Sequence, residues 1–305
     1  MILVTGGTGF IGQALVRQLV EMGKPVRILL RPSRTSPQLP QGVSIEVAVS
    51  SLKDERGLRS AMKDVDVVFH LAGSERLSSR ADLQGVDING TKMITEAAQQ
   101  AGVKQIIFLS HLGADRVSAF PVLKAKALAE YAITHSALQY TILRSAVVFG
   151  PGDQFTVSLA RLLRMSPGFF LSPGDGSVLL QPLWVEDLVT CLIWALDDPS
   201  MVNQTISIGG GELLTYRETV EIICSELGIH RPLINMTPAY LRKIALWVEH
   251  LNPRFPVSIF WLDYLSADRT CDLDVLPRRF GIMPARLEHH VQYLRDEVRR
   301  KPRIR

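Results

Sequence analysis

The chain contains little cysteine and no long uncharged apolar run. Its 305 residues include three cysteines, Cys191, Cys224 and Cys271, which lie far apart and outside any Cys-x-x-Cys or Cys/His spacing. This argues against disulfides and a structural zinc site. No apolar run is long enough to cross a bilayer, and the first apolar run begins at Ile2, which leaves no room for a signal peptide. We therefore expect a cytoplasmic protein, or one peripheral to the inner face of a membrane.

Strong charge of either sign is also missing. The formal net charge is +4, and much of the excess lies in the C-terminal residues Arg295, Arg299, Arg300, Lys301, Arg303 and Arg305. There is no basic face interleaved with aromatics, so a nucleic-acid partner is not expected. The segment Glu288-His289-His290 has no second ligand pair at metal spacing, and we expect no metal.

The most informative feature is a glycine-rich turn at the start of the chain. The apolar run Ile2–Thr5 leads directly into Gly6, Gly9 and Gly12, and a helical apolar pattern follows. Glycine lets a backbone approach a pyrophosphate closely, and the N-terminus of the following helix presents unpaired N–H groups to that anion. The strand before the turn and the helix after it make this a predicted nucleotide-binding turn.

Apolar runs alternate with helical patterns through the first 150 residues. This alternation predicts an α/β fold with a doubly wound parallel sheet. The expected strands are Ile2–Thr5, Val26–Leu30, Ile45–Val49, Val67–Leu71, Ile106–Ser110 and Thr141–Val148.

Beyond Gly150, prolines and glycine-rich turns interrupt the pattern. We assign residues 1–150 to a dinucleotide-binding domain, to which 181–207 return as a strand and a helix. Residues 151–180 and 208–305 then form a smaller, mainly helical domain.

Five separate segments carry a family resemblance over almost the whole chain. They are Thr5–Gly12, Asp66–Gly73, Asp87–Thr91, Arg144–Asp153 and Gln181–Asp187. Together they resemble the extended and atypical short-chain dehydrogenase/reductase superfamily, which has a Rossmann fold and NAD-dependent epimerase/dehydratase-like members. Within it the chain is most similar to the NmrA-like branch and to bacterial relatives of the NADPH-binding accessory subunit of respiratory complex I.

The resemblance implies a dinucleotide site. The residues that it assigns to the turn and to the strand ends around the cofactor are Gly6, Thr8, Gly9, Phe10, Ile11, Gly12, Leu71, Ala72, Gly73, Ser110, Lys124, Ala146 and Val147. Ser51, before Leu52, stands where relatives commonly carry an Asp for the adenine.

The residues after the second strand favour NADP(H) over NAD(H). NAD-specific relatives place an acid there, whereas this chain has Arg31, Ser33 and Arg34 with no nearby carboxylate. Two guanidiniums and a hydroxyl suit a 2′-phosphate, while exposed loop charges are the alternative interpretation.

The catalytic pattern of the family is broken here. The family uses a Tyr four residues before a Lys, and we place this pair at Phe120 and Lys124, so that Phe120 removes the proton carrier. The carbonyl-orienting Ser corresponds to His111 or, with a one-residue slip, to Ser110. His111 is a candidate proton donor at neutral pH, with a structural role as the alternative.

Two functions follow. The first is an NADP(H)-binding accessory, assembly or sensor protein that meets a protein complex or a membrane surface through residues 238–265 and the basic tail, unless that apolar segment is covered by its own core. The second is an NADPH-dependent oxidoreductase or epimerase-like enzyme for a quinone-like or isoprenoid substrate. Its predicted pocket contains Phe120, Phe149, Gln154, Phe155, Gln181 and Trp184.

Overall fold

A computed structural model describes residues 1–33, 39–40, 42–251, 256 and 259–299. It divides into two compact units. Unit 1 contains residues 1–75, 82–145 and 188–207, and unit 2 contains residues 76–81, 146–187 and 208–305. Residues 181–187, which we assigned to the first domain, fall in unit 2.

Unit 1 is built on a seven-stranded sheet with the order β11-β6-β5-β4-β1-β2-β3. The strands are β1 (Ile2–Thr5), β2 (Val26–Leu30), β3 (Glu46–Val49), β4 (Val67–His70), β5 (Gln105–His111), β6 (Gln139–Ser145) and β11 (Gln204–Ile208). In this sheet order, each strand from β6 through β5, β4, β1 and β2 to β3 pairs in parallel with its neighbour. The doubly wound α/β fold is confirmed, with the strands close to their predicted bounds.

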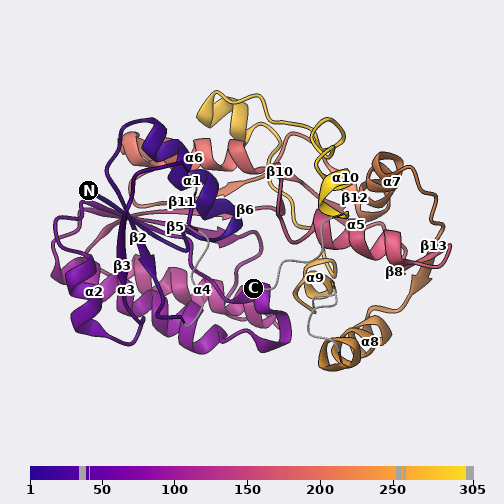
Figure 1. Cartoon of the computed structure of the whole chain (residues 1–305), viewed down its shortest axis with the longest axis horizontal. Coiled ribbons are helices and arrows are strands. Elements are labelled where there is room, and N and C mark those ends of the chain that lie inside the picture. The colour runs from indigo at the N-terminus through magenta and orange to yellow at the C-terminus, as the bar shows by residue number, and fades with distance from the viewer. Residues whose placement is uncertain (34–38, 41, 252–255, 257–258, 300–305) are drawn as a thin grey trace. The chain divides into compact units, whose positions relative to one another are not determined.

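Helices cover both faces of this sheet (Figure 1). They are α1 (Phe10–Glu21), α2 (Glu55–Ala61), α3 (Asn89–Gln100), α4 (Pro121–Thr134) and α6 (Val185–Asp197), with a π-helical turn η2 (Leu83–Ile88) before α3. Helices α2, α3 and α4 lie on one face, where Leu58, Ile94 and Ala129 join the apolar residues of the strands in one core. Strands buried on both faces need such continuous apolar runs.

The order of the strands reverses at β1, which lies between β2 and β4. The chain therefore winds outward in both directions from this point. In open parallel sheets, ligands bind at the carboxyl ends of the strands beside such a reversal. The turn after β1 and the turn after β4 meet there.

Unit 2 combines short strand pairs with helices. Its strands are β7 (Val148–Phe149), β8 (Phe170–Pro173), β9 (Leu179–Leu180), β10 (Leu183–Trp184), β12 (Leu214–Thr215) and β13 (Leu233–Met236), paired as β10–β7, β12–β9 and β13–β8. Its longer helices are α5 (Thr156–Met165), α7 (Tyr216–Leu227) and α8 (Pro238–Leu251), followed by the short α9 (Ile259–Tyr264) and α10 (Leu294–Glu297). Short turns η1 (Glu75–Arg80), η3 (Pro199–Met201), η4 (Leu276–Phe280) and η5 (Leu287–His289) connect elements of the chain.

Candidate functional site

The turn between β1 and α1 leaves no room for side chains at two of its glycines. Gly6 has φ +73°, and a Cβ there would lie 2.7 Å from the backbone carbon of Leu71. A Cβ on Gly12 would lie 2.2 Å from the carbonyl oxygen of Gly6. The Gly9 N–H donates to the same oxygen at 2.9 Å. The turn is therefore as tight as a pyrophosphate cradle requires.

The N-terminus of α1 is suited to an anion. Its N-cap is Gly9, which has no side chain to cap the first turn, and no acidic residue lies in that turn. The N–H groups of the first turn and the positive end of the helix dipole thus face the loop. The residues at this end of the sheet fit the pyrophosphate of a dinucleotide.

A buried histidine ties the turn after β4 to the rest of the site. The Thr5 hydroxyl lies 2.6 Å from Nδ1 of His70, and Nε2 of His70 lies 2.9 Å from the Thr91 hydroxyl. The Ala72 N–H donates to Thr5 at 3.3 Å, and Thr91 donates to the carbonyl of Asp87 at 2.5 Å. Burial, and secondarily the charge of Lys126, lowers the pKa of His70 to about 3. This neutral imidazole is the centre of a hydrogen-bonded chain, a role beyond the packing that its strand position indicates.

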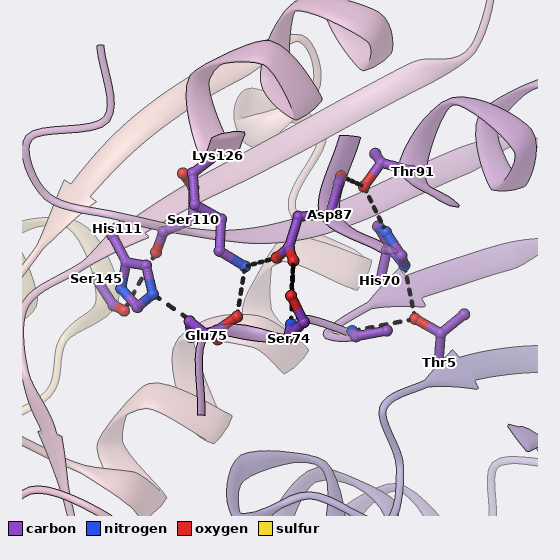
Figure 2. A network of polar contacts seen from close by, with 11 residues as sticks. Thr5, His70, Ser74, Glu75, Asp87, Thr91, Ser110, His111, Lys126 and Ser145 are labelled. Carbon is purple, nitrogen blue, oxygen red and sulfur yellow. Dashed lines mark hydrogen bonds and ion pairs between the residues drawn. The ribbon is translucent and has the colours of Figure 1, made fainter. Parts of the chain in front are cut away.

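A buried lysine forms the second half of the network (Figure 2). Lys126 of α4 is 4% exposed, and its Nζ lies 3.8 Å from Glu75 and 3.7 Å from Asp87. The other oxygen of Asp87 accepts hydrogen bonds from the N–H of Ser74 at 3.1 Å and from its hydroxyl at 2.5 Å. His111 at the end of β5 lies 3.9 Å from Glu75. One cation thus lies between two carboxylates, as buried charges require.

Each pKa in this cluster reflects burial working against opposite charges. Burial would raise the pKa of Glu75, but Lys126 and His111 outweigh it and hold the pKa below its ordinary value. For Asp87, burial prevails over Lys126, and its pKa is raised. Burial alone would lower the pKa of Lys126, yet Glu75 and Asp87 raise it. The two carboxyl groups therefore hold the lysine in its charged form.

The structure brings Lys126, rather than Lys124, into this network. Lys124 is exposed, and Phe120 is the N-cap residue of α4. The residue four positions before Lys126 is Val122, so the Tyr-x-x-x-Lys spacing ending at the buried lysine also lacks a hydroxyl. Lys126 follows Leu123 by three residues and precedes Glu130 by four, all three on the buried side of α4. This spacing was the signal in the sequence that marks the lysine as buried.

Ser110 and His111 lie at the carboxyl end of β5. Ser110 is fully buried, and its carbonyl accepts a hydrogen bond from the Ser145 hydroxyl at 3.3 Å. The side chain of His111 is 20% exposed. Of the predicted catalytic residues, His111 contacts the charged cluster through Glu75.

The predicted residues at the adenosine end are dispersed over loops. Arg31 and Ser33 are exposed after β2, while Arg34 lies outside the described residues. Ser51 accepts a hydrogen bond from the Lys53 N–H at 3.2 Å in a turn, and Leu52 packs against Gly90 of α3. Ala146 and Val147, which the resemblance places at a strand end around the cofactor, are buried residues of unit 2.

Five of the six residues of the predicted substrate pocket lie in unit 2, and their surroundings differ. Gln181 is fully buried; its amide nitrogen donates to the Gly210 carbonyl at 2.7 Å and its oxygen accepts from the Cys271 N–H at 2.8 Å. Both ends of its side-chain amide are therefore hydrogen bonded to backbone groups of unit 2. Gln154 is exposed. The ring of Phe149 packs on Trp184 with 5.2 Å between ring centroids, and that of Phe155 packs on Trp261 with 4.8 Å between ring centroids.

The apolar segment 238–265 divides between core and surface. On α9, Phe260 and Tyr264 are 8% and 2% exposed. On α8, a stripe at helical spacing is exposed instead, formed by Tyr240, Ile244, Trp247 and Leu251. No helix in the described part of the chain is long and apolar enough to cross a membrane.

Comparison with known proteins decides the family. A family model described as NAD(P)H-binding matches residues 6–154. Subunit 9 of the NADH dehydrogenase [ubiquinone] 1 alpha subcomplex from Arabidopsis thaliana is 30% identical, over 95% of this chain and 77% of that protein. The chain belongs to the atypical short-chain dehydrogenase/reductase superfamily.

Other relatives of this reductase-like protein carry enzyme names. Sterol demethylase protein B from Methylococcus capsulatus is 29% identical over 83% of the chain and 82% of its own length. The NADPH complex of the Escherichia coli quinone oxidoreductase QOR2 has the same fold, with a TM-score of 0.74 and 19% identity over 98% of this chain and 99% of that one. The chain is thus an NAD(P)H-binding member of this superfamily, and its relatives include a subunit of an NADH dehydrogenase [ubiquinone] subcomplex and proteins with enzyme names.

Proposed function

We propose that this protein binds NADP(H) as a resident ligand and works as an accessory, assembly or sensor protein of a larger complex. The observation that carries the proposal is that Lys126 of α4 is paired with carboxylates and has no tyrosine four residues before it. Lys126 lies between Glu75 and Asp87, and neither Val122 nor Phe120 has a hydroxyl to transfer a proton. The usual tyrosine acid/base of the family is absent whichever lysine defines the motif.

The network around Lys126 supports a structural role for the bound nucleotide. His70, Ser74 and Asp87 hydrogen bond the turn after β4 to its surroundings, and that turn lies against Gly6. A ligand that binds the folded state alone stabilises it by mass action. Cofactor bound at the two turns therefore strengthens the fold without any turnover.

The preference for the phosphorylated cofactor rests on the loop after β2. Arg31 and Ser33 follow the strand, and Arg34 comes next in the sequence. No carboxylate accompanies them to repel a 2′-phosphate, and a guanidinium binds such a group through charge-assisted bonds.

The surface for a partner is the exposed stripe on α8. Tyr240 is 64%, Trp247 66% and Leu251 63% exposed. Aromatic and aliphatic side chains in one exposed stripe mark a contact surface for a protein or a membrane edge. The Arabidopsis thaliana relative described above is by name a subunit of the mitochondrial NADH dehydrogenase [ubiquinone] 1 alpha subcomplex.

The test is native purification followed by identification of the released nucleotide and an activity screen. We expect NADPH or NADP⁺ in the released fraction and no consumption of NADPH with a panel of quinones and simple carbonyl compounds. Val122→Tyr restores the hydroxyl in the register of Lys126, and Phe120→Tyr is the matched control in the register of Lys124. Turnover by the unmodified protein at about 10 per second, an ordinary enzyme rate, would refute the accessory role.

A second candidate is a reductase that uses His111 as proton donor. The observation in its favour is the contact between His111 and Glu75 at 3.9 Å, because a neighbouring carboxylate orients an imidazole. This enzyme would consume NADPH, and His111→Gln would abolish that consumption while nucleotide binding persists. Loss of a general acid lowers the rate by about 10²–10⁴-fold.

A further inference from the structure

Unit 2 contains an apolar cavity of about 410 Å³. Helices α5, α8 and α9 and the strand β8 contribute to its lining. Representative lining residues are Leu159, Leu162, Leu241, Ala245, Val248 and Trp261. The cavity belongs to unit 2 alone, and none of the glycine-turn residues lines it.

The lining is suited to hydrocarbon. Among the described residues that form it none is charged, and the polar ones are Ser158, Ser166 and Tyr216. Ser166 donates its hydroxyl hydrogen to the Leu162 carbonyl at 2.8 Å, and burial raises the pKa of Tyr216. A compact polar ligand would lose its hydration here with few new hydrogen bonds, whereas an apolar chain loses nothing.

The size of the cavity matches a ligand rather than a packing defect. Ligand sites in proteins commonly measure about 300–1,000 Å³, while a cavity of ~150 Å³ already binds benzene. Two lining residues are also exposed at the surface, Ile244 at 45% and Phe169 at 40%. An elongated molecule therefore has a route of entry beside these side chains.

We propose that this cavity holds the hydrocarbon chain of a single-chain lipid, with the head group outside near Ile244 and Phe169. One side of α8 lines the cavity through Leu241, Ala245 and Val248. The adjoining side carries the exposed stripe with Tyr240 and Trp247. Apolar surface therefore continues from the cavity to the outside of the helix, as transfer of a chain from a lipid phase requires. This site goes beyond the proposed function, since it needs no nucleotide.

Binding is tested by displacement of the fluorescent fatty acid cis-parinaric acid from the purified full-length chain. Competitors are capric, lauric, myristic and palmitic acids in one series and geraniol, farnesol and geranylgeraniol in the other. Each added methylene in the first series strengthens binding about fourfold, corresponding to about 0.8 kcal/mol, until the cavity is filled. The stronger series identifies the source of the chain as acyl or isoprenoid. Affinity that is independent of chain length in both series would overturn the proposal.

Matched substitutions on α8 locate the bound chain. Ala245 is 3% exposed and lines the cavity, whereas Ala239 lies exposed on the same helix and outside the lining. We expect Ala245→Phe to lower the affinity for the fatty acid at least tenfold. Ala239→Phe should leave this affinity unchanged. Equal binding by both variants would mean adsorption to the surface and would refute the cavity site.

Two further measurements keep the test independent of folding and of the proposed function. Ser158→Phe fills the cavity from α5 and replaces Ala245→Phe if that variant does not fold. A brominated fatty acid should quench Trp261 fluorescence, and Trp261→Phe should remove this part of the quenching. NADPH binding is measured in parallel on the unmodified protein and on every variant. If none of them binds NADPH while lipid binding is intact, the proposed function is refuted and the lipid site is not.

Discussion

Lys126 and Glu75 form a buried ion pair at 3.8 Å, although they lie far apart in the sequence on α4 and in the turn after β4. Asp87 lies on the other side of the same ammonium group at 3.7 Å. The ammonium group of Lys126 therefore compensates the charge of two carboxyl groups that come from two different segments of the chain.

Removal of the buried cation should destabilise unit 1 strongly. Lys126→Met leaves Glu75 and Asp87 without their opposite charge, and breaking a buried pair costs about 3–5 kcal/mol in the free energy of unfolding. Lys124→Met is the control, because Lys124 is exposed and should change stability by less than about 0.5 kcal/mol. Urea unfolding measures both. Equal effects of the two substitutions would contradict the assignment of Lys126 to the cluster.

The glycine turn should tolerate no side chain at Gly12. Gly12→Ala places a Cβ 2.2 Å from the carbonyl oxygen of Gly6, and overpacking of this kind costs about 1–3 kcal/mol. At Gly9 a Cβ would lie 3.1 Å from that oxygen, so Gly9→Ala should fold with a smaller loss. We expect Gly9→Ala to weaken NADPH binding nonetheless, because the methyl group lies at the N-terminus of α1. Unchanged calorimetric affinity would exclude the turn as the cofactor site.

The two nucleotides should differ in affinity. We expect NADPH to bind more tightly than NADH. Arg31→Ala combined with Arg34→Ala should cost about 2–4 kcal/mol with NADPH, because each guanidinium makes one charge-assisted contact that solvent partly screens. Binding of NADH should change little, since it has no 2′-phosphate. Calorimetry of both nucleotides measures this, and equal affinities in the unmodified protein would refute the preference.

Mild acid should destabilise the protein through His70. Its pKa is about 3 in the folded chain against about 6.5 when unfolded, so between these values the unfolded state binds more protons. The stability contributed by the neutral imidazole is present above about pH 6.5 and falls with acidification by at most about 1.4 kcal/mol per pH unit. His70→Gln should reduce this slope between pH 6.5 and pH 5.5, values that bracket the upper part of the window. If the urea midpoint shifts by the same amount between these two pH values in His70→Gln and in the unmodified protein, the buried neutral state of His70 is contradicted.

The local chemistry of the chain could be predicted from its sequence because it depends on neighbours along the chain. The glycines after Thr5 require a tight turn, and the apolar runs require a sheet covered on both faces. The residues four positions before Lys124 and Lys126 are Phe120 and Val122, and the sequence alone shows that neither is a tyrosine. These features predicted the α/β fold and the binding of a pyridine nucleotide, which the sheet topology and the family model confirm. The broken catalytic motif stays a prediction.

The tertiary structure alone decided which polar residues meet. Lys124 and Lys126 are two positions apart, which on a helix turns their side chains by about 200° relative to each other. The spacing of Lys126 with Leu123 and Glu130 favours the buried side of α4, but only the packing of α4 brings the lysine to Glu75 and Asp87. The partners of Glu75 and Gln181 could not be predicted from the sequence either. Glu75 pairs with a lysine of a distant helix, and the Gln181 amide is hydrogen bonded to backbone groups of unit 2. Such partners are set by the packing of elements remote in sequence, which no local pattern encodes.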